Sequence, residues 1–307
     1  MNTGNFRRSP WWFRLINKGW RHTYPLTRIS LQRDDLIKAA RNQTGLTDFG
    51  TAFDTRSLDI LLNSIETEAE LHPVGRFITR QRFVSLLVMR LRAEYYFKKY
   101  PAILEQDLYP SWFILGLQRT GTTKLQRLLA TDPDHRVVYS WEAINPVPLS
   151  LNFDPVENAV KDIRKRISVA ETSARALGIM SPGFNAIHPI QIHEPEEDIL
   201  VLDISFMSTT PEAMMNVPTY AHWLEQTDQT PAYLYAIKLL KLLQWQRPAR
   251  RWILKSPHHL EFAEIISKNF GDVHFLWPHR NIYESIPSFL SMVTYTNMIF
   301  SDNIDIR

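Results

Sequence analysis

The sequence contains no cysteine among its 307 residues. Disulfide bridges, zinc–thiolate sites and a cysteine nucleophile are therefore excluded, and nothing points to an oxidising compartment. Long apolar runs are also missing, because the longest candidate, residues 83–89, falls far short of the roughly 18 residues that a membrane-spanning helix needs. The first residues mix arginines with tryptophans and lack the continuous apolar segment of a signal peptide. We therefore expect a cytoplasmic protein that does not cross a bilayer.

What the chain does contain is typical of a large folded domain, since 44% of its residues are hydrophobic and 22% are charged. Its formal net charge of +3 is mildly basic. Such a charge fits an anionic ligand and gives no reason to expect a nucleic acid. We therefore predict no nucleic-acid partner.

The spacing of apolar residues divides the chain into two regions. Across residues 32–99 they recur at helical spacing, which predicts a helical N-terminal region over residues 1–109. The pattern changes at Pro110: residues 112–117 form a short apolar run that ends in glycines and threonines, and leucines at helical spacing follow. This order predicts a strand, a turn and a helix.

Further elements of both kinds follow. Residues 251–254 and 273–277 are short strand-like runs that each precede a helical segment, and residues 156–177 and 233–243 have helical spacing. Alternation of strands and helices predicts an α/β fold: a P-loop-type, doubly wound parallel sheet flanked by helices, with a helical N-terminal extension. We assign residues 110–307 to this α/β domain. Within it, the proline-rich residues 145–231 are expected to form an irregular insertion.

The first motif is the loop at residues 116–123, which read GLQRTGTT. Its glycines have the spacing of a Walker A loop, in which backbone N–H groups and a helix N-terminus hold phosphate oxygens. The Walker lysine is replaced by Thr122, and the loop's cation is Arg119. Such a loop suits a single 5′-phosphate that bears a transferable group. An ordinary strand-to-helix turn, with Arg119 paired to a carboxylate, is the alternative.

The second motif follows the run at residues 273–277. Arg280 lies in a His-Arg-Asn sequence, and Ser288 comes eight residues later. An arginine at the end of a strand and a serine two turns into the next helix can converge on one phosphate. Alternatively, Arg280 caps a helix and Ser288 only fills space.

Together the two motifs resemble the cofactor site of sulfotransferases that use 3′-phosphoadenosine-5′-phosphosulfate (PAPS), especially the bacterial and tyrosylprotein branch, where arginine replaces the loop lysine. The resemblance covers residues 112–292. It implies transfer of a sulfuryl group from PAPS to a hydroxyl or amine and release of PAP. We expect no metal, because prolines disfavour one regular helix that presents both His188 and His193, and no third ligand motif accompanies them. The implied PAPS-binding residues are Gly116, Arg119, Thr120, Gly121, Thr122, Thr123, Arg280 and Ser288.

The resemblance also bears on the rest of the chain. The acceptor would be a small molecule, glycan, lipid or peptide, and the proline-rich insertion at residues 145–231 is expected to form its pocket. Bacterial relatives usually continue well beyond residue 307, and sulfotransferases commonly add a basic C-terminal loop over the 3′-phosphate. We therefore expect a short or truncated member of the family.

Sulfuryl transfer needs cations and a proton acceptor. Lys255 ends a predicted strand, where ligands of α/β sheets collect, and in related enzymes such a lysine stabilises the transferred group; a solvated surface lysine is the alternative. Together with Arg119 it would carry the catalysis. Glu142 resembles the glutamate base that follows the first helix in related enzymes, although it also suits a helix N-terminus. His193 is the second candidate base, in an acidic stretch that also suits the first turn of a helix.

Two other functions compete with this interpretation. An NTP-dependent kinase is suggested by the apolar residues 199–202 and Asp203, which imitate a Walker B strand, although the acidic stretch before them predicts a helix start. Peripheral contact with an anionic membrane is suggested by a basic, aromatic N-terminus and would be compatible with catalysis. The residues of that N-terminal group are Arg7, Arg8, Trp11, Trp12, Arg14 and Trp20.

Overall fold

The computed structural model describes residues 9–108, 111–248 and 250–303. A four-stranded sheet with the order β2-β3-β1-β4 lies within them, and all of its strand pairs are parallel. Trp112 of the inner strand β1 is paired with Ile253 on one side and His274 on the other. The strands are β1 (Ser111–Ile114), β2 (His135–Arg136), β3 (Arg251–Lys255) and β4 (Val273–Leu276).

Helices cover both faces of the sheet's inner strands, as parallel strands require. On one face, Ile114 and Ile253 pack against leucines of α6 (Thr122–Leu129). On the other face, the ring of Phe113 meets Phe270 edge to face at 5.0 Å, just after α14 (Ala263–Asn269). Burial on both faces explains why these strands read as short continuous apolar runs.

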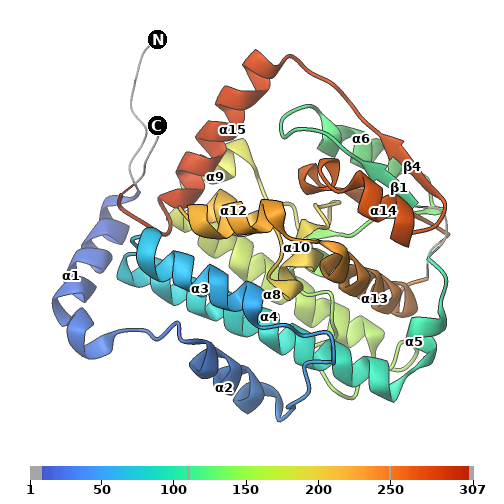
Figure 1. Cartoon of the computed structure of the whole chain (residues 1–307), viewed down its shortest axis with the longest axis horizontal. Coiled ribbons are helices and arrows are strands. Elements are labelled where there is room, and N and C mark those ends of the chain that lie inside the picture. The colour runs from blue at the N-terminus through green and yellow to red at the C-terminus, as the bar shows by residue number, and fades with distance from the viewer. Residues whose placement is uncertain (1–8, 109–110, 249, 304–307) are drawn as a thin grey trace.

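The remaining helices of this region pack around the sheet and against one another (Figure 1). They are α7 (Ser140–Ile144), α8 (Ala159–Met180), α9 (Pro182–Ile187), α10 (Ile199–Leu202), α11 (Thr210–Met214), α12 (Pro218–Gln226), α13 (Thr230–Gln246) and α15 (Ile282–Asn297), with short 3₁₀ helices η1 (Asp203–Ser205) and η2 (Pro257–Leu260).

The N-terminal part of the chain is helical, as predicted, and α2 packs along α4 at the lower side of Figure 1. One continuous hydrophobic core joins these helices to the sheet, extending from Leu36 through Phe83 and Phe113 to Phe300. None of the described helices is long and apolar enough to cross a membrane. The helices are α1 (Trp11–Thr27), α2 (Arg33–Thr44), α3 (Arg56–Glu68), α4 (Pro73–Lys99) and α5 (Ala102–Glu105).

The predicted fold class is confirmed, and the elements differ from expectation mainly at their ends. The segment at residues 145–231 is more regular than expected, because it contains the 22-residue helix α8. That helix begins at Ala159, three residues later than predicted, because the carboxylate of Asp154 accepts the backbone N–H groups of Val156 and Glu157 in a turn. The strand predicted at residues 112–117 ends at Ile114, where the chain enters the glycine loop.

Candidate functional site

The predicted site residues follow the carboxyl ends of the strands. The loop at residues 116–123 follows β1, Lys255 ends β3, and Arg280 comes shortly after β4. Because parallel strands all end at the same edge of a sheet, the topology brings these segments together.

The loop after β1 is a tight turn that leads into α6. Gly116 has φ 139° and Gly121 has φ 91°, conformations that favour glycine, and Arg119 adopts a left-handed conformation with φ 70°. A Cβ atom at Gly116 would lie 3.2 Å from the carbonyl oxygen of Pro278, so the chain after β4 packs directly on the loop. The hydroxyl of Thr120 donates to the carbonyl of Leu117 at 2.7 Å, which closes the turn.

Three predicted cofactor residues meet beside this loop. Nε of Arg119 donates to Oγ of Ser288 at 2.9 Å, and Nη1 of Arg280 donates to the carbonyl oxygen of Arg119 at 3.1 Å. The other guanidinium nitrogens of Arg280 reach a carboxylate oxygen of Glu284 at 2.8 and 3.0 Å. Both arginines are exposed, so two cations and a hydroxyl lie together at the surface.

Lys255 is fully buried, with 0% of its surface exposed, so the alternative of a solvated surface lysine is wrong. Its Nζ lies 2.9 Å from Oε1 of Glu197. Its backbone N–H donates to Oδ1 of Asp198 at 2.8 Å, and the backbone N–H of Glu196 donates to the carbonyl of Val138 at 2.9 Å. Residues 194–198, here called the acidic segment, thus cross the carboxyl edge of the sheet and bring the carboxylate of Glu197 to Lys255.

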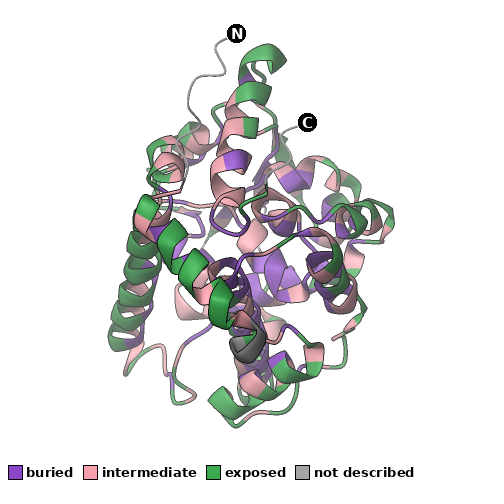
Figure 2. Cartoon of the chain, turned by 90° about the vertical axis from the view of Figure 1, so that its left-hand side faces the viewer, coloured by how far each residue is buried: buried purple, intermediate pink, exposed green. Residues whose placement is uncertain are grey.

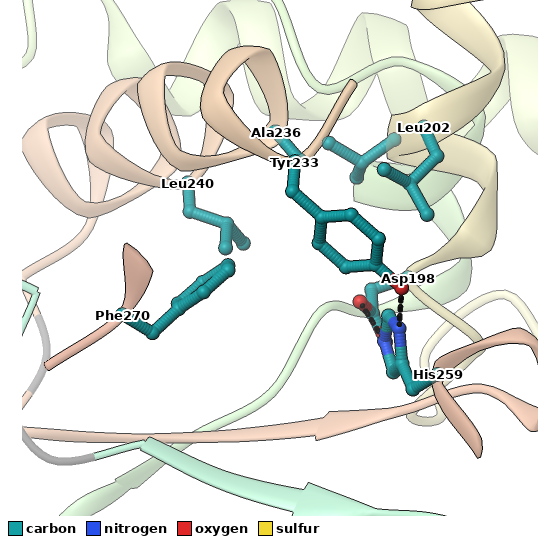
Figure 3. A pocket seen from close by; sticks show the side chains of 8 residues that line it. Asp198, Leu202, Tyr233, Ala236, Leu240, His259 and Phe270 are labelled. Atoms are coloured by element: carbon teal, nitrogen blue, oxygen red, sulfur yellow. Dashed lines mark hydrogen bonds and ion pairs between the residues drawn. The ribbon is translucent and has the colours of Figure 1, made fainter. Parts of the chain in front are cut away.

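Beneath this segment lies a buried chain of polar groups (Figure 3). Nε2 of His259 is 2.8 Å from Oδ2 of Asp198, and the hydroxyl of Tyr233 is 2.9 Å from Nδ1 of the same ring. Burial alone would raise the pKa of Asp198, but His259 and the Lys255 amide lower it below its usual value. The adjoining cavity, about 10 Å³, scarcely admits one water molecule. These groups therefore fix the acidic segment in the core.

Glu142 lies at the start of α7 and is almost completely buried. Its carboxylate accepts two hydrogen bonds from Arg136 at 2.7 and 2.8 Å, one from Arg247 at 3.2 Å and one from the backbone N–H of Tyr139 at 3.1 Å. Burial would raise its pKa, but the two arginines outweigh burial and lower it. This arrangement agrees with the alternative role that the sequence analysis gave Glu142, a structural carboxylate at the N-terminus of a helix.

His193 is exposed on the turn before Pro195, four residues from Glu197. In the described residues no cluster of three or more metal-binding side chains is found, and the expectation of a metal-free enzyme stays a prediction. Asp203 does not end a strand, because residues 199–205 are helical. It is buried, pairs with Arg82 and accepts a hydrogen bond from Ser208. The prediction of a helix in place of a Walker B strand is confirmed, although the helix begins at Ile199, after the acidic residues expected in its first turn. The helix removes the main support for a kinase.

Sequence reasoning missed two residues that the structure brings to the site. Glu197 was treated as a first-turn helix residue, but α10 begins only at Ile199. A lysine predicted at the end of a buried strand could have prompted a search for its carboxylate. Trp277 was included only in an apolar run, yet it is 54% exposed and its ring lies tilted against that of His279, at 4.7 Å between centroids. It directly precedes the Pro278 carbonyl that packs on the loop.

The fold and this edge of the sheet define a parallel α/β protein with a strand-to-helix glycine loop. The family model described as "Sulfotransferase family" matches residues 110–307. The chain therefore belongs to the sulfotransferase family, whose members transfer sulfuryl groups. Curated proteins gave no significant match.

Two solved structures have the same fold. The sulfotransferase STF1 of Mycobacterium tuberculosis superposes with a TM-score of 0.76 at 30% identity, over 88% of this chain and 73% of that one. The sulfotransferase STF9 of Mycobacterium avium superposes with a TM-score of 0.75 at 24% identity, over 90% of this chain and 69% of that one. The second similarity concerns the fold alone.

Proposed function

We propose that the protein transfers the sulfuryl group of PAPS to a hydroxyl or amine of an acceptor and releases PAP. The observation that carries this proposal is the meeting of Arg119, Arg280 and Ser288, which are far apart in the sequence, beside the glycine loop. PAPS carries a phosphosulfate at its 5′ position and a phosphate at its 3′ position. The loop with Arg119 would hold the first, and Arg280 with Ser288 would hold the second.

The backbone of the loop is accessible at Gly121. A Cβ atom at Gly121 would meet no atom within 4 Å, so the backbone at the start of α6 is open on that side. The backbone N–H groups and the positive end of the helix dipole favour an anion there.

The arginines are held by contacts that an anion can replace. Arg280 is paired with Glu284 at the surface, and such exposed pairs contribute only about 0–1 kcal/mol. Bidentate bonds from arginine to phosphate are stronger, so a phosphate would displace the carboxylate. Trp277 offers an exposed aromatic face to the adenine, where stacking contributes about 1–3 kcal/mol per base.

For the transfer itself we assign Lys255 and Arg119 to the charge that spreads over the sulfuryl oxygens. Lys255 is a buried cation, and electrostatic interactions are stronger where water is excluded. In the reaction the acceptor oxygen or nitrogen forms a bond to sulfur, the bond between sulfur and the phosphate oxygen breaks, and PAP departs with the electron pair.

We assign the acceptor's proton to Glu197 in preference to Glu142. Glu197 is partly exposed, and one of its oxygens contacts Lys255, whereas the carboxylate of Glu142 is enclosed by two arginines. A base must reach the proton directly or through one water, and the four hydrogen bonds from Arg136, Arg247 and Tyr139 already occupy the carboxylate oxygens of Glu142. His193, exposed four residues before Glu197, is the other candidate.

The test is the affinity for PAP of the variants Arg119→Ala and Arg280→Ala, measured by titration calorimetry. Each removes charged hydrogen bonds worth about 1.5–3 kcal/mol, so the dissociation constant should rise roughly 10- to 100-fold. The matched control is Arg250→Ala, because Arg250 is an exposed, ion-paired arginine that precedes β3 at the opposite edge of the sheet. Unchanged affinity in both site variants would refute the site.

A kinase is the competing function, and titration of the unchanged protein with PAP and with ATP separates the two functions. Binding of PAP without magnesium, with no measurable affinity for ATP, supports the sulfotransferase. Magnesium-dependent binding of ATP would contradict it. A screen of acceptors with labelled PAPS would then identify the acceptor class.

A further inference from the structure

The helix α1 docks on the protein through one side only. The ring of Phe13 packs edge to face on His72 at 5.4 Å, and Oδ1 of Asn17 accepts the backbone N–H of Val74 at 3.1 Å. Both residues are buried. The helix crosses the front of the molecule in Figure 2, and its outward side is largely exposed.

The outward side carries large apolar side chains. Trp11, Leu15 and Ile16 are 68%, 57% and 51% exposed. Such side chains are usually buried, and a contiguous exposed group of them marks a surface that meets an apolar partner. Trp11 and Leu15, four residues apart, share one face of the helix.

The charged residues of the segment that contains this helix all have one sign. Residues 1–33 contain seven lysines and arginines and no aspartate or glutamate, whereas the rest of the chain has more acidic than basic side chains. Arg14 and Lys18 are exposed on α1. Arg21 pairs with Asp302 at 2.6 Å, which ties the helix to the segment after α15. Arg7 and Arg8 lie outside the described residues.

We propose that α1 lies in the surface of an anionic lipid bilayer, with Trp11, Leu15 and Ile16 inserted between headgroups and Arg14 and Lys18 against the lipid phosphates. Helices that bind membranes in this way combine an apolar face containing tryptophan or leucine with lysine and arginine beside it. This inference does not depend on the sulfuryl-transfer chemistry, because α1 contributes no residue to the proposed PAPS site.

The alternative occupant of this face is a second copy of the chain. Two copies joined through α1 would bring together two uniformly basic segments, and like charges at an interface are unfavourable. An anionic bilayer satisfies the apolar side chains and the charge at once. The charge therefore favours lipid.

The test is sedimentation of the whole protein with vesicles of phosphatidylcholine alone and of phosphatidylcholine with phosphatidylglycerol. Binding is expected to the anionic vesicles and to fall as salt is raised. Leu15→Ser should weaken binding to the anionic vesicles about tenfold or more, because the variant inserts less apolar surface into the bilayer. Lys18→Gln should weaken it roughly fivefold on anionic vesicles only, since one charge near such a surface contributes about 1 kcal/mol.

The matched control is Val156→Ser, which changes an apolar residue that is 91% exposed on the loop before α8. It should bind vesicles like the unchanged protein. Absence of vesicle binding, equal binding to both vesicle types, or unchanged binding by Leu15→Ser would overturn the proposal. So would a concentration-dependent dimer in analytical ultracentrifugation that Leu15→Ser abolishes, because it would assign the face to self-association.

Discussion

At the scale of single residues, Glu142 and Glu197 occupy opposite environments although both are carboxylates near the carboxyl edge of the sheet. Glu142 is enclosed by Arg136 and Arg247, and Glu197 is partly exposed with one contact to Lys255. Removing one partner of a buried ion pair is costly, whereas a partly solvated carboxylate is easily replaced. The two glutamates should therefore respond to the same substitution in different ways.

Glu142→Gln should destabilise the protein by about 3 kcal/mol in denaturant unfolding, because it leaves the buried Arg136 without its counter-charge and removes the carboxylate that Arg247 also contacts. Glu197→Gln should destabilise the protein less than Glu142→Gln, because Glu197 is partly exposed and its amide oxygen still accepts from the buried Lys255. It should lower kcat about 100-fold or more if Glu197 takes the proton. A stable but inactive Glu142→Gln protein, beside an active Glu197→Gln protein, would instead make Glu142 the base.

A third carboxyl group makes stability depend on pH. Burial and the neighbouring Glu225 and Glu261 raise the pKa of Glu212 to about 7. Below the pKa that Glu212 has in the unfolded chain, its carboxyl group is protonated in the folded and the unfolded protein, so it does not make the free energy of unfolding depend on pH. As the pH rises from there to 7, the unfolded chain loses this proton first, so stability falls.

Glu212→Gln should therefore raise the melting temperature at pH 8 and leave it unchanged at pH 4. The gain at pH 8 should be on the order of 1 kcal/mol, allowing for screening by solvent around this partly buried group. The control is Glu264→Gln, whose exposed carboxylate has its pKa lowered by pairing with Lys268 and should give no such gain. An equal effect of Glu212→Gln at both pH values would contradict the shift.

At the scale of elements, the start of α4 packs closely on the segment that follows α15. A Cβ atom at Gly75 would lie 2.2 Å from the carbonyl oxygen of Phe300, and the backbone N–H of His72 donates to the same oxygen at 3.0 Å. The segment after α15 thus packs on the first turn of α4 and can only do so against a glycine.

Gly75→Ala should destabilise the protein by about 1–3 kcal/mol, because α4 and the segment after α15 must separate. The matched substitution is Gly19→Ala in α1, where a Cβ atom meets nothing within 4 Å. There alanine should stabilise by about 0.5–1 kcal/mol through its better helix propensity. Thermal unfolding of both variants measures the difference, and equal effects would refute the close packing.

The elements also show what local sequence can predict. Three of the four described strands were predicted, because a short apolar run between turn residues is a local signal, and the long helices were predicted from the spacing of their apolar residues. Strand β2 was not predicted, because its two residues, His135 and Arg136, form no apolar run. The start of α8 was misplaced because one side chain, Asp154, competes for the backbone N–H groups of the expected first turn. The helical content of residues 145–231 was underestimated because prolines there begin helices, as Pro182, Pro211 and Pro218 do.

At the scale of the whole molecule, one hydrophobic core joins the N-terminal helices to the sheet. Ligand bound at the carboxyl edge should therefore stabilise the chain beyond the sheet itself. PAP at 100 times its dissociation constant should add about 2.7 kcal/mol to the free energy of unfolding. Thermal unfolding with and without PAP measures this, and hydrogen exchange in α4 should slow as well.

Arg280→Ala should lose most of this shift at the same PAP concentration, and a chelator should not change it, because the proposed site uses no metal. A shift that is equal in Arg280→Ala, or that requires magnesium, would contradict the proposed donor site. Protection confined to the sheet, with α4 unaffected, would instead show that the core does not unfold as one unit.

The sequence by itself determined three of the four described strands, the helices that follow them and the glycine loop, because periodicity and glycine positions act on neighbouring residues. It also placed Arg119, Arg280 and Ser288 in two motifs, through their resemblance to a known family. Only the tertiary structure decided which groups surround each carboxylate. Burial encloses Glu142 between two arginines and leaves Glu197 open beside Lys255, and burial depends on segments more than 50 residues apart in the chain.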